Sequence, residues 1–116
     1  MLGGLDMLDE RIKNEQIDDL VRAMIELDET EEAYRFFEDI FTIHELQAVA
    51  QRLAVARLLR RKVTYQEIAD KTGASTATIS RVNRCLSYGA GGYQRMLDKL
   101  DVLDAATDET SKEDRP

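Results

Sequence analysis

Residues 75–84 carry short polar side chains and arginines of the kind that contact nucleic acid. With 3.6 residues per turn, six of these side chains lie at the start or along one face of a helix. They are Ser75, Thr76, Ala77, Ser80, Arg81 and Arg84. Short side chains let a helix approach base edges, hydroxyls bond to either kind of base, a methyl group can touch thymine, and arginine binds guanine or phosphate. The pattern therefore predicts a helix that docks in the major groove of double-stranded DNA.

The surrounding segment, 64–87, predicts two helices joined by a tight turn. Thr64 can cap the first helix, and Gly73 can end it in a left-handed conformation. In the second helix, Ile79 and Val82 point away from the polar face and towards the first helix. This spacing is typical of a helix-turn-helix, and the alternative is an ordinary αα-hairpin within a helical bundle.

Positive charge is concentrated around this motif although the whole chain is acidic. The 116 residues have a net charge of −7. Residues 52–84 nevertheless hold 8 basic and 2 acidic residues, whereas residues 1–51 hold 4 basic and 14 acidic ones. Because DNA affinity depends on the local charge of the contacting surface, the overall charge does not exclude a DNA partner.

Further residues before and within the motif could contact the DNA backbone. Gln66 and Lys71 are predicted to contact it from the first helix of the motif. Possible phosphate contacts at the end of the preceding helix and the start of the motif are Arg60, Arg61, Lys62 and Thr64. The alternative for the three cations is that they only stabilise a helix C-terminus, where positive charge is favourable.

The spacing of apolar residues predicts an all-α fold of about six helices, with one domain over 15–103. The expected helices are 15–27, 31–41, 43–62, the two within 64–87, and 92–103. A buried stripe is expected on the long helix at Leu46, Val49, Ala50, Leu53 and Ala56. Residues 1–14 are predicted to be a flexible N-terminus, and the polar residues 104–116 a disordered tail. The apolar faces of 15–27 and 92–103 could bind a second chain, so we expect a homodimer.

The composition gives no indication of an enzyme. The chain has one histidine, His44, one cysteine, Cys85, and no glycine-rich phosphate loop. No catalytic residue, metal ligand or cofactor is predicted, and Cys85 is expected to be a small packed side chain, with a reactive thiol as the alternative. Without a secretory signal or an apolar run of about 18 residues, the chain is expected in the cytoplasm with no membrane partner.

Two segments resemble a known family. The sequence Gly-Ala-Ser-Thr-Ala-Thr-Ile-Ser-Arg at 73–81, preceded by Thr-Ile-His-Glu-Leu at 42–46 and by Arg52, resembles the Trp repressor superfamily. Residues 17–102, with Tyr-Arg-Phe-Phe-Glu-Asp at 34–39, resemble its Trp-repressor-related YerC/YecD branch. The resemblance implies an intertwined all-α homodimer whose two helix-turn-helices bind a two-fold operator. It also implies transcriptional control, as a repressor, in a bacterial cytoplasm.

The resemblance also indicates where a tryptophan ligand would bind. In the Trp repressor, tryptophan lies between two arginines, with a threonine on each side and a glycine beside the indole. The matching residues here are Thr42, Arg52, Thr78, Arg81 and Val82. Val82 takes the place of the glycine, and its branched side chain would occupy the space that the indole needs. We therefore predict a vestigial pocket and no requirement for tryptophan; any other small-molecule effector is unknown.

A second class of function fits the same residues. The chain could be a protein-interaction or assembly module that retains a helix-turn-helix shape, because a fold can be reused and the acidic N-terminal half could bind a basic partner. A steep salt dependence of DNA binding would favour the DNA-binding regulator over this module.

Overall fold

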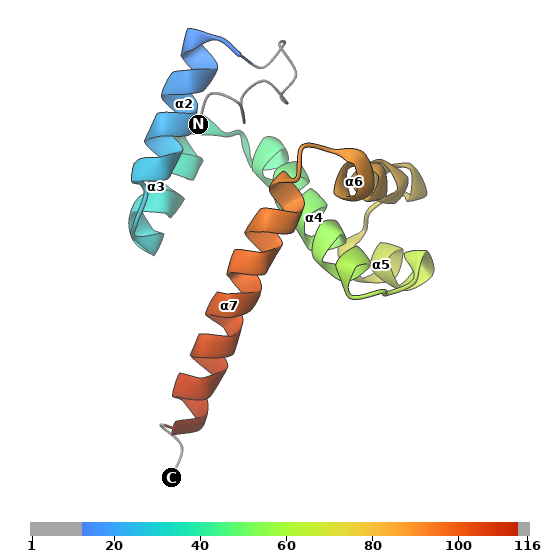
Figure 1. Cartoon of the computed structure of the whole chain (residues 1–116). Coiled ribbons are helices and arrows are strands. Elements are labelled where there is room, and N and C mark those ends of the chain that lie inside the picture. The colour runs from blue at the N-terminus through green and yellow to red at the C-terminus, as the bar shows by residue number, and fades with distance from the viewer. Residues whose placement is uncertain (1–12, 114–116) are drawn as a thin grey trace. The chain divides into compact units, whose positions relative to one another are not determined.

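A computed structural model describes residues 13–113, and the side chains of residues 13–107. All regular structure in this part of the chain is helical (Figure 1). The six helices are α2 (Glu15–Glu26), α3 (Thr30–Ile40), α4 (Ile43–Arg60), α5 (Tyr65–Thr72), α6 (Thr76–Tyr88) and α7 (Gly92–Glu113). The predicted all-α fold of about six helices is confirmed.

The contacts divide the chain into two compact units, Met1–Val49 and Ala50–Pro116. The division falls inside α4, so the first unit contains α2, α3 and the start of α4, and the second unit contains the rest. The single domain expected over 15–103 therefore stays a prediction.

In the first unit, α2 begins at a side-chain cap. The Ile17 N–H donates to Asn14 Oδ1 at 2.8 Å, which pairs one of the free N–H groups of the first turn. Ordered structure thus begins before residue 15, where the flexible N-terminus was expected to end. Residues 1–12 of that predicted segment lie outside the described residues.

The aromatic residues of α3 pack on one another within the first unit. The ring centroids of Phe37 and Phe41 are 5.7 Å apart in an edge-to-face arrangement, and those of Phe36 and Phe37 are 6.4 Å apart. Even so, neither α2 nor α3 contains a buried residue. Ile25 is 74 % exposed and Tyr34 is 70 % exposed, so the apolar faces of these helices are uncovered in the single chain.

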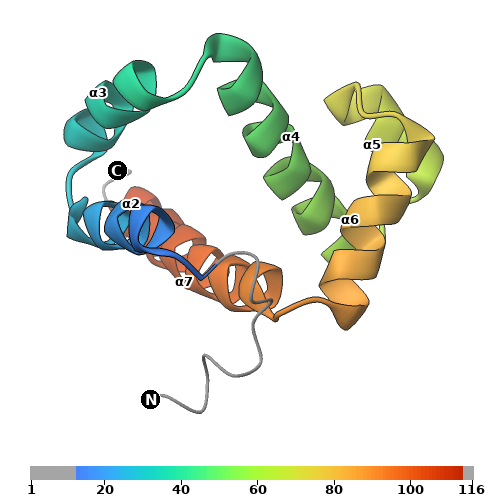
Figure 2. The same cartoon turned by 90° about the horizontal axis from the view of Figure 1, so that it is seen from above.

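The core of the second unit holds the helix-turn-helix in place. In Figures 1 and 2, α5 and α6 follow the end of α4, and α7 leaves from the end of α6. The buried residues come from all four helices and from the turn between α5 and α6. They are Val55, Ala56, Ile68, Ala74, Ile79, Val82 and Leu97.

A Schellman motif ends α4 and turns the chain into α5. The Val63 N–H donates to the Leu58 carbonyl at 3.1 Å, and the Lys62 N–H donates to the Leu59 carbonyl at 3.0 Å. Lys62 occupies the left-handed position of this motif with φ 65°, where glycine is usual. The helix therefore ends at Arg60, two residues before the predicted end.

The predicted buried stripe of α4 is mostly wrong. Of its five residues only Ala56 is buried; Val49 is 42 % exposed and Leu53 is 38 % exposed. The helix-turn-helix covers a different side of α4, and Val55 is buried there instead. Leu53 and Ala50 line an open, largely apolar groove of about 500 Å³.

The prediction of a disordered tail from residue 104 also differs from the structure, because α7 continues to Glu113. Ala105 and Ala106 are strong helix formers, and no glycine or proline interrupts the chain between Gly92 and Pro116. Asp104 faces Arg57 with a nitrogen–oxygen distance of 3.7 Å.

None of the described helices combines the length and the apolar composition that a membrane span requires.

Candidate nucleic-acid interface

Hydrogen-bonded caps define both ends of α5. The hydroxyl of Thr64 accepts from the Glu67 N–H at 3.3 Å, as the sequence predicted. At the other end, Gly73 has φ 74°, and its N–H donates to the Ala69 carbonyl at 2.9 Å. A side chain would have room here, because an added Cβ would meet no atom closer than 4.0 Å. The reason for a glycine is therefore the left-handed backbone conformation, which other residues adopt only at a cost.

Hydroxyl groups close the turn between α5 and α6. Thr72 donates to the Ile68 carbonyl at 2.7 Å and accepts from the Ala74 N–H at 3.1 Å. The next hydroxyl, that of Ser75, accepts from the Thr78 N–H at 3.1 Å and caps α6. These bonds fix the direction in which α6 leaves the turn.

A contact that sequence reasoning missed attaches this turn to α4. Gln51 Nε2 donates to the Thr72 carbonyl at 3.1 Å. The bond pairs one of the free carbonyls at the end of α5. The two residues are 21 positions apart, and a polar residue on an amphipathic helix gives no sequence signal for such a partner.

The structure exposes every residue predicted to bind DNA from the helix-turn-helix. These residues are Gln66, Lys71, Ser75, Thr76, Ala77, Ser80, Arg81 and Arg84. On the opposite side of α6, Ile79 is 0 % exposed and Val82 is 1 % exposed. The predicted orientation of α6 is therefore observed, whereas the individual DNA contacts stay predictions.

Cys85 is exposed, so the expectation of a packed side chain is wrong. At about 100° per residue, it lies to one side of the face formed by Ile79, Val82 and Leu86. It is also one helical turn after Arg81, and so lies at the edge of the polar face.

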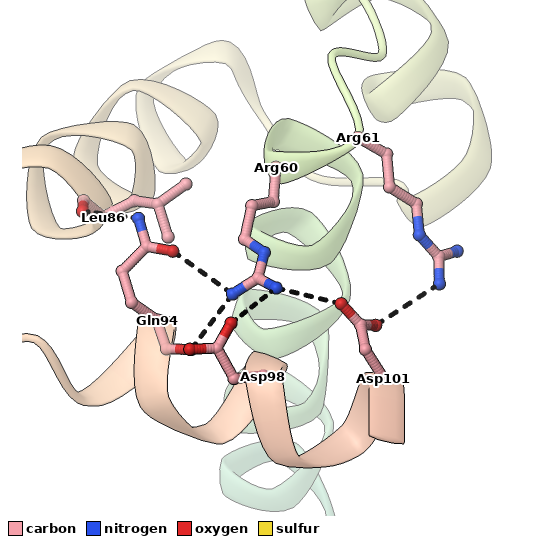
Figure 3. Close-up of polar contacts among 6 residues, drawn as sticks. All are labelled: Arg60, Arg61, Leu86, Gln94, Asp98 and Asp101. Atoms are coloured by element: carbon pink, nitrogen blue, oxygen red, sulfur yellow. Dashed lines mark hydrogen bonds and ion pairs between the residues drawn. The ribbon is translucent and has the colours of Figure 1, made fainter. Parts of the chain in front are cut away.

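The basic residues at the end of α4 face carboxylates of α7 (Figure 3). Arg60 Nη2 is 2.8 Å from Asp98 Oδ1 and 2.9 Å from Asp101 Oδ2. Arg60 Nη1 donates to the backbone carbonyl of Gln94 at 3.0 Å and to its side-chain oxygen at 3.3 Å. The guanidinium of Arg60 already has acceptors on α7, which a phosphate would have to displace, so the phosphate contact of Arg60 stays a prediction. The sequence contained a signal for these acceptors: acids at 98, 101 and 104 share one face of a helix.

The other predicted phosphate contacts remain open to solvent. Arg61 is 3.9 Å from Asp101 Oδ1 and 55 % of its side chain is exposed. Lys62 and Thr64 are also exposed.

Five basic residues within 52–84 make no ion pair with the described part of the chain. They are Arg52, Lys62, Lys71, Arg81 and Arg84, and all of them are exposed. The positive charge of residues 52–84 thus falls into two groups. Arg57, Arg60 and Arg61 are near carboxylates of α7, whereas the other five are available to an external anion.

The residues that match the tryptophan pocket have other structural roles. Thr42, in the first unit, forms a reciprocal capping box. Its N–H donates to Glu45 Oε1 at 2.8 Å, and its hydroxyl accepts from the Glu45 N–H at 3.1 Å. Hydrogen bonding to the Glu45 carboxylate, first by the Thr42 backbone N–H and second by the Thr42 side chain, lowers the pKa of Glu45 below its ordinary value.

In the second unit, two of the matching residues on α6 already take part in packing or hydrogen bonding within the chain. Val82 is buried in the core, and the Thr78 hydroxyl accepts from Ser75 at 3.1 Å. Arg52 and Arg81 are exposed. Elsewhere among the described residues, no group of three or more His, Cys, Asp or Glu side chains could hold a metal ion.

Together, these features define an all-α protein with a helix-turn-helix whose second helix presents a polar, basic face. Comparison with known proteins identifies the family. The family described as Trp repressor protein matches residues 15–101. The uncharacterized protein YerC of Bacillus subtilis (strain 168) is 48 % identical over 103 residues, which cover 89 % of this chain and 97 % of YerC. The chain therefore belongs to the Trp repressor family, in the branch that includes YerC.

Two solved structures share the fold. A TrpR-like protein from Eubacterium eligens ATCC 27750 is 48 % identical, with a TM-score of 0.77 over 80 % of this chain and 96 % of that one. A candidate Trp repressor from Staphylococcus aureus is 41 % identical, with a TM-score of 0.76 over 79 % of this chain and 92 % of that one.

Proposed function

We propose that the chain is a sequence-specific DNA-binding transcriptional regulator that acts as a homodimer in the bacterial cytoplasm and represses its targets. The observation that carries the proposal is the exposed face of α6. It combines short hydroxyl side chains with Arg81 and Arg84, neither of which makes an ion pair with the described residues. Membership of a family of regulators supports the same function.

The face divides into two kinds of expected contact. Ser75, Thr76, Ala77 and Ser80 are short, so α6 can approach base edges closely. Lys71 and Gln66 lie on α5, from which they would contact the DNA backbone. Arg61, Lys62 and Thr64 are exposed just before α5 and add possible phosphate contacts.

A dimer follows from the same reasoning. One short recognition helix reads few base pairs, and two of them spaced ~34–36 Å apart read two half-sites one DNA turn apart. Exposed apolar residues on α2, such as Val21 and Ile25 at 50 % and 74 %, offer a surface for a second copy. We expect a dimer at micromolar concentration. Light scattering that shows a monomer throughout that range would remove the basis for two-fold binding.

We propose further that DNA binding does not require tryptophan. Val82 is 1 % exposed and Ile79 is 0 % exposed, so both pack against the rest of the second unit. Moving the valine to admit an indole would expose apolar surface at ~25 cal/mol per Å². A ligand shifts an equilibrium only if it binds two states differently, and α6 is already held by this packing and by its caps.

The test begins with selection of binding sites from random DNA by the purified full-length chain. Recovery of a two-fold sequence supports the regulator, and affinity for that sequence should then fall steeply with salt, by ~0.9 in log–log slope for each phosphate contacted. Failure to select any sequence, with a shallow slope, would favour a protein-interaction module instead.

A second experiment tests whether tryptophan is required, and it uses the selected operator at one fixed salt concentration. Calorimetry should show no heat of binding when tryptophan is added, and operator affinity should be the same with and without it. Measurable heat together with a tenfold gain in affinity, worth ~1.4 kcal/mol, would show that tryptophan gates the protein.

A further inference from the structure

A continuous set of hydrogen bonds joins the helix before the DNA-binding motif to the helix after it (Figure 3). Gln94, near the start of α7, donates from Nε2 to the Leu86 carbonyl near the end of α6 at 3.2 Å. The same residue accepts from Arg60 through both its backbone carbonyl and its side-chain oxygen, at 3.0 and 3.3 Å. Arg60 is the last residue of α4. The ends of α4 and α6 are thus connected through one residue of α7.

The arginine is anchored to α7 by charge as well. Asp98 and Asp101 are three positions apart, so their carboxylates lie on one face of the helix and meet Arg60 Nη2 at 2.8 and 2.9 Å. The Arg60 side chain is only 26 % exposed. It borders a small cavity that is also lined by Leu97, which is fully buried. Lysine could not reproduce this arrangement, because an ammonium lacks the planar fork that reaches several acceptors at once.

We infer that Arg60 and Gln94 are positioning residues that set the orientation of α6, and therefore the half-site spacing at which the dimer binds DNA. This inference rests on the proposed function. A rotation of α6 against α4 would break the bond between Gln94 and Leu86 or those between Gln94 and Arg60. Because α6 would carry the base contacts, a looser joint changes the angle at which each subunit presents them.

The competing explanation is that Arg60 binds a phosphate directly, and the two explanations differ in a measurable way. Loss of a phosphate contact lowers the salt slope of operator binding by ~0.9 and weakens all DNA sequences alike. Loss of a positioning residue leaves the slope unchanged and alters the preference for spacing.

The experiment uses full-length chains with Arg60→Lys, Arg60→Gln or Gln94→Ala. Arg95→Lys is the matched control, because Arg95 is the exposed neighbour of Gln94 and makes no ion pair with the described residues. Each chain is tested against a library in which the two half-sites of the wild-type operator are separated by different numbers of base pairs. Operator affinity at several salt concentrations and thermal unfolding are measured in parallel.

We expect Arg60→Lys and Arg60→Gln to lose at least tenfold in affinity at the wild-type spacing and to accept neighbouring spacings, with the salt slope unchanged. Gln94→Ala should broaden the spacing preference to a smaller extent, and Arg95→Lys should match wild type. If Arg60→Gln fails to fold, the spacing preference of Gln94→Ala tests the inference instead. The Gln94 side chain is uncharged and exposed, so we expect this variant to fold.

Two results would overturn the inference. Unchanged spacing preference in all variants would show that the network positions nothing, and a salt slope lower by ~0.9 in Arg60→Gln alone would identify a phosphate contact. If the wild-type chain selects no operator, the proposed function fails first, and this inference fails with it.

Discussion

The two units of the chain place their apolar side chains differently. All seven buried residues of the described chain lie in the second unit, where α4, α5, α6 and α7 cover one another. In the first unit, α2 and α3 are amphipathic helices with no buried residue. Isolated helices shorter than about 12–15 residues are marginal in water. The second unit can therefore be stabilised within one chain, whereas the first needs an apolar surface from outside the unit.

The largest expected effect comes from the core of the second unit. Ile68→Ala should cost about 2–5 kcal/mol of unfolding free energy, because it leaves a cavity where Ile68 is fully buried. Tyr88→Ala is the control; this side chain is 87 % exposed, and its loss should change stability by less than about 0.5 kcal/mol. Denaturant titrations followed by circular dichroism measure both. An equal loss of unfolding free energy in Ile68→Ala and Tyr88→Ala would mean that the second unit is not the stable part of the chain.

The exposed polar face of the second unit should affect DNA binding without affecting folding. Arg84→Ala or Arg81→Ala should cost about 1–3 kcal/mol in operator affinity if the guanidinium binds guanine in a bidentate manner, and should relax the preference at one base position. Lys71→Ala, as a backbone contact, should weaken binding to all sequences alike. Wild-type affinity of both arginine variants would show that the recognition face has been misassigned.

The uncovered face of the first unit should matter for association. Ile25→Asp places a charge on a surface that we expect the second copy to cover, so the variant should be monomeric where wild type is dimeric. Its melting temperature should then no longer rise with protein concentration. Arg22→Ala is the control on α2, because this side chain is 81 % exposed and paired only with Asp19 at 3.5 Å within the described residues. A dimeric Ile25→Asp would place the interface elsewhere.

A smaller effect is expected where the second unit carries backbone strain. Lys62 has φ 65°, and a left-handed conformation costs a non-glycine residue about 1–2 kcal/mol. Lys62→Gly should therefore raise the free energy of unfolding by about 1 kcal/mol. Lys62→Ala removes the same ammonium but keeps the strain, so it should show no such gain. Equal stability of the two variants would contradict this account of the α4 end.

The smallest effect concerns the cap of α4 in the first unit. The capping bonds with Thr42 lower the pKa of Glu45 in the folded chain. The ionised carboxylate thus contributes stability above its unfolded pKa, and this contribution is lost as the pH falls through the lowered folded pKa. The difference in melting temperature between wild type and Glu45→Gln should therefore shrink as the pH is lowered from 7 to 3. A difference that is independent of pH would show that the charge does not contribute.

Local signals in the sequence were sufficient for the helix-turn-helix. Gly73 at the turn, Ser75 at the cap, and Ile79 and Val82 on the inner face each depend on neighbours within a few residues, and the structure places all four as predicted. The C-terminal limit of α7 was wrong, because a polar composition was interpreted as disorder although the residues are good helix formers.

The contacts between distant residues could not be predicted in the same way. Gln51 and Thr72, and Arg60 and Asp101, meet only after the helices have packed. A basic residue has the same appearance in sequence whether its partner is a phosphate or a carboxylate 41 positions away. The prediction of a buried stripe on α4 was wrong for a related reason. Periodicity identifies an apolar face of a helix, but it does not show whether this chain or another chain covers that face.

The exposed position of Cys85 gives the chain a convenient spectroscopic reporter. It is the sole cysteine among the 116 residues, and it lies exposed on α6, one helical turn after Arg81 at the edge of the face proposed to contact DNA. A nitroxide attached there would introduce one label per subunit, so a dimer would contain a single pair of spins. The dipolar coupling of that pair would report the separation of the two recognition helices in solution, before any operator sequence is known. Repeating the measurement with DNA bound would show whether the helices move when the protein engages its site.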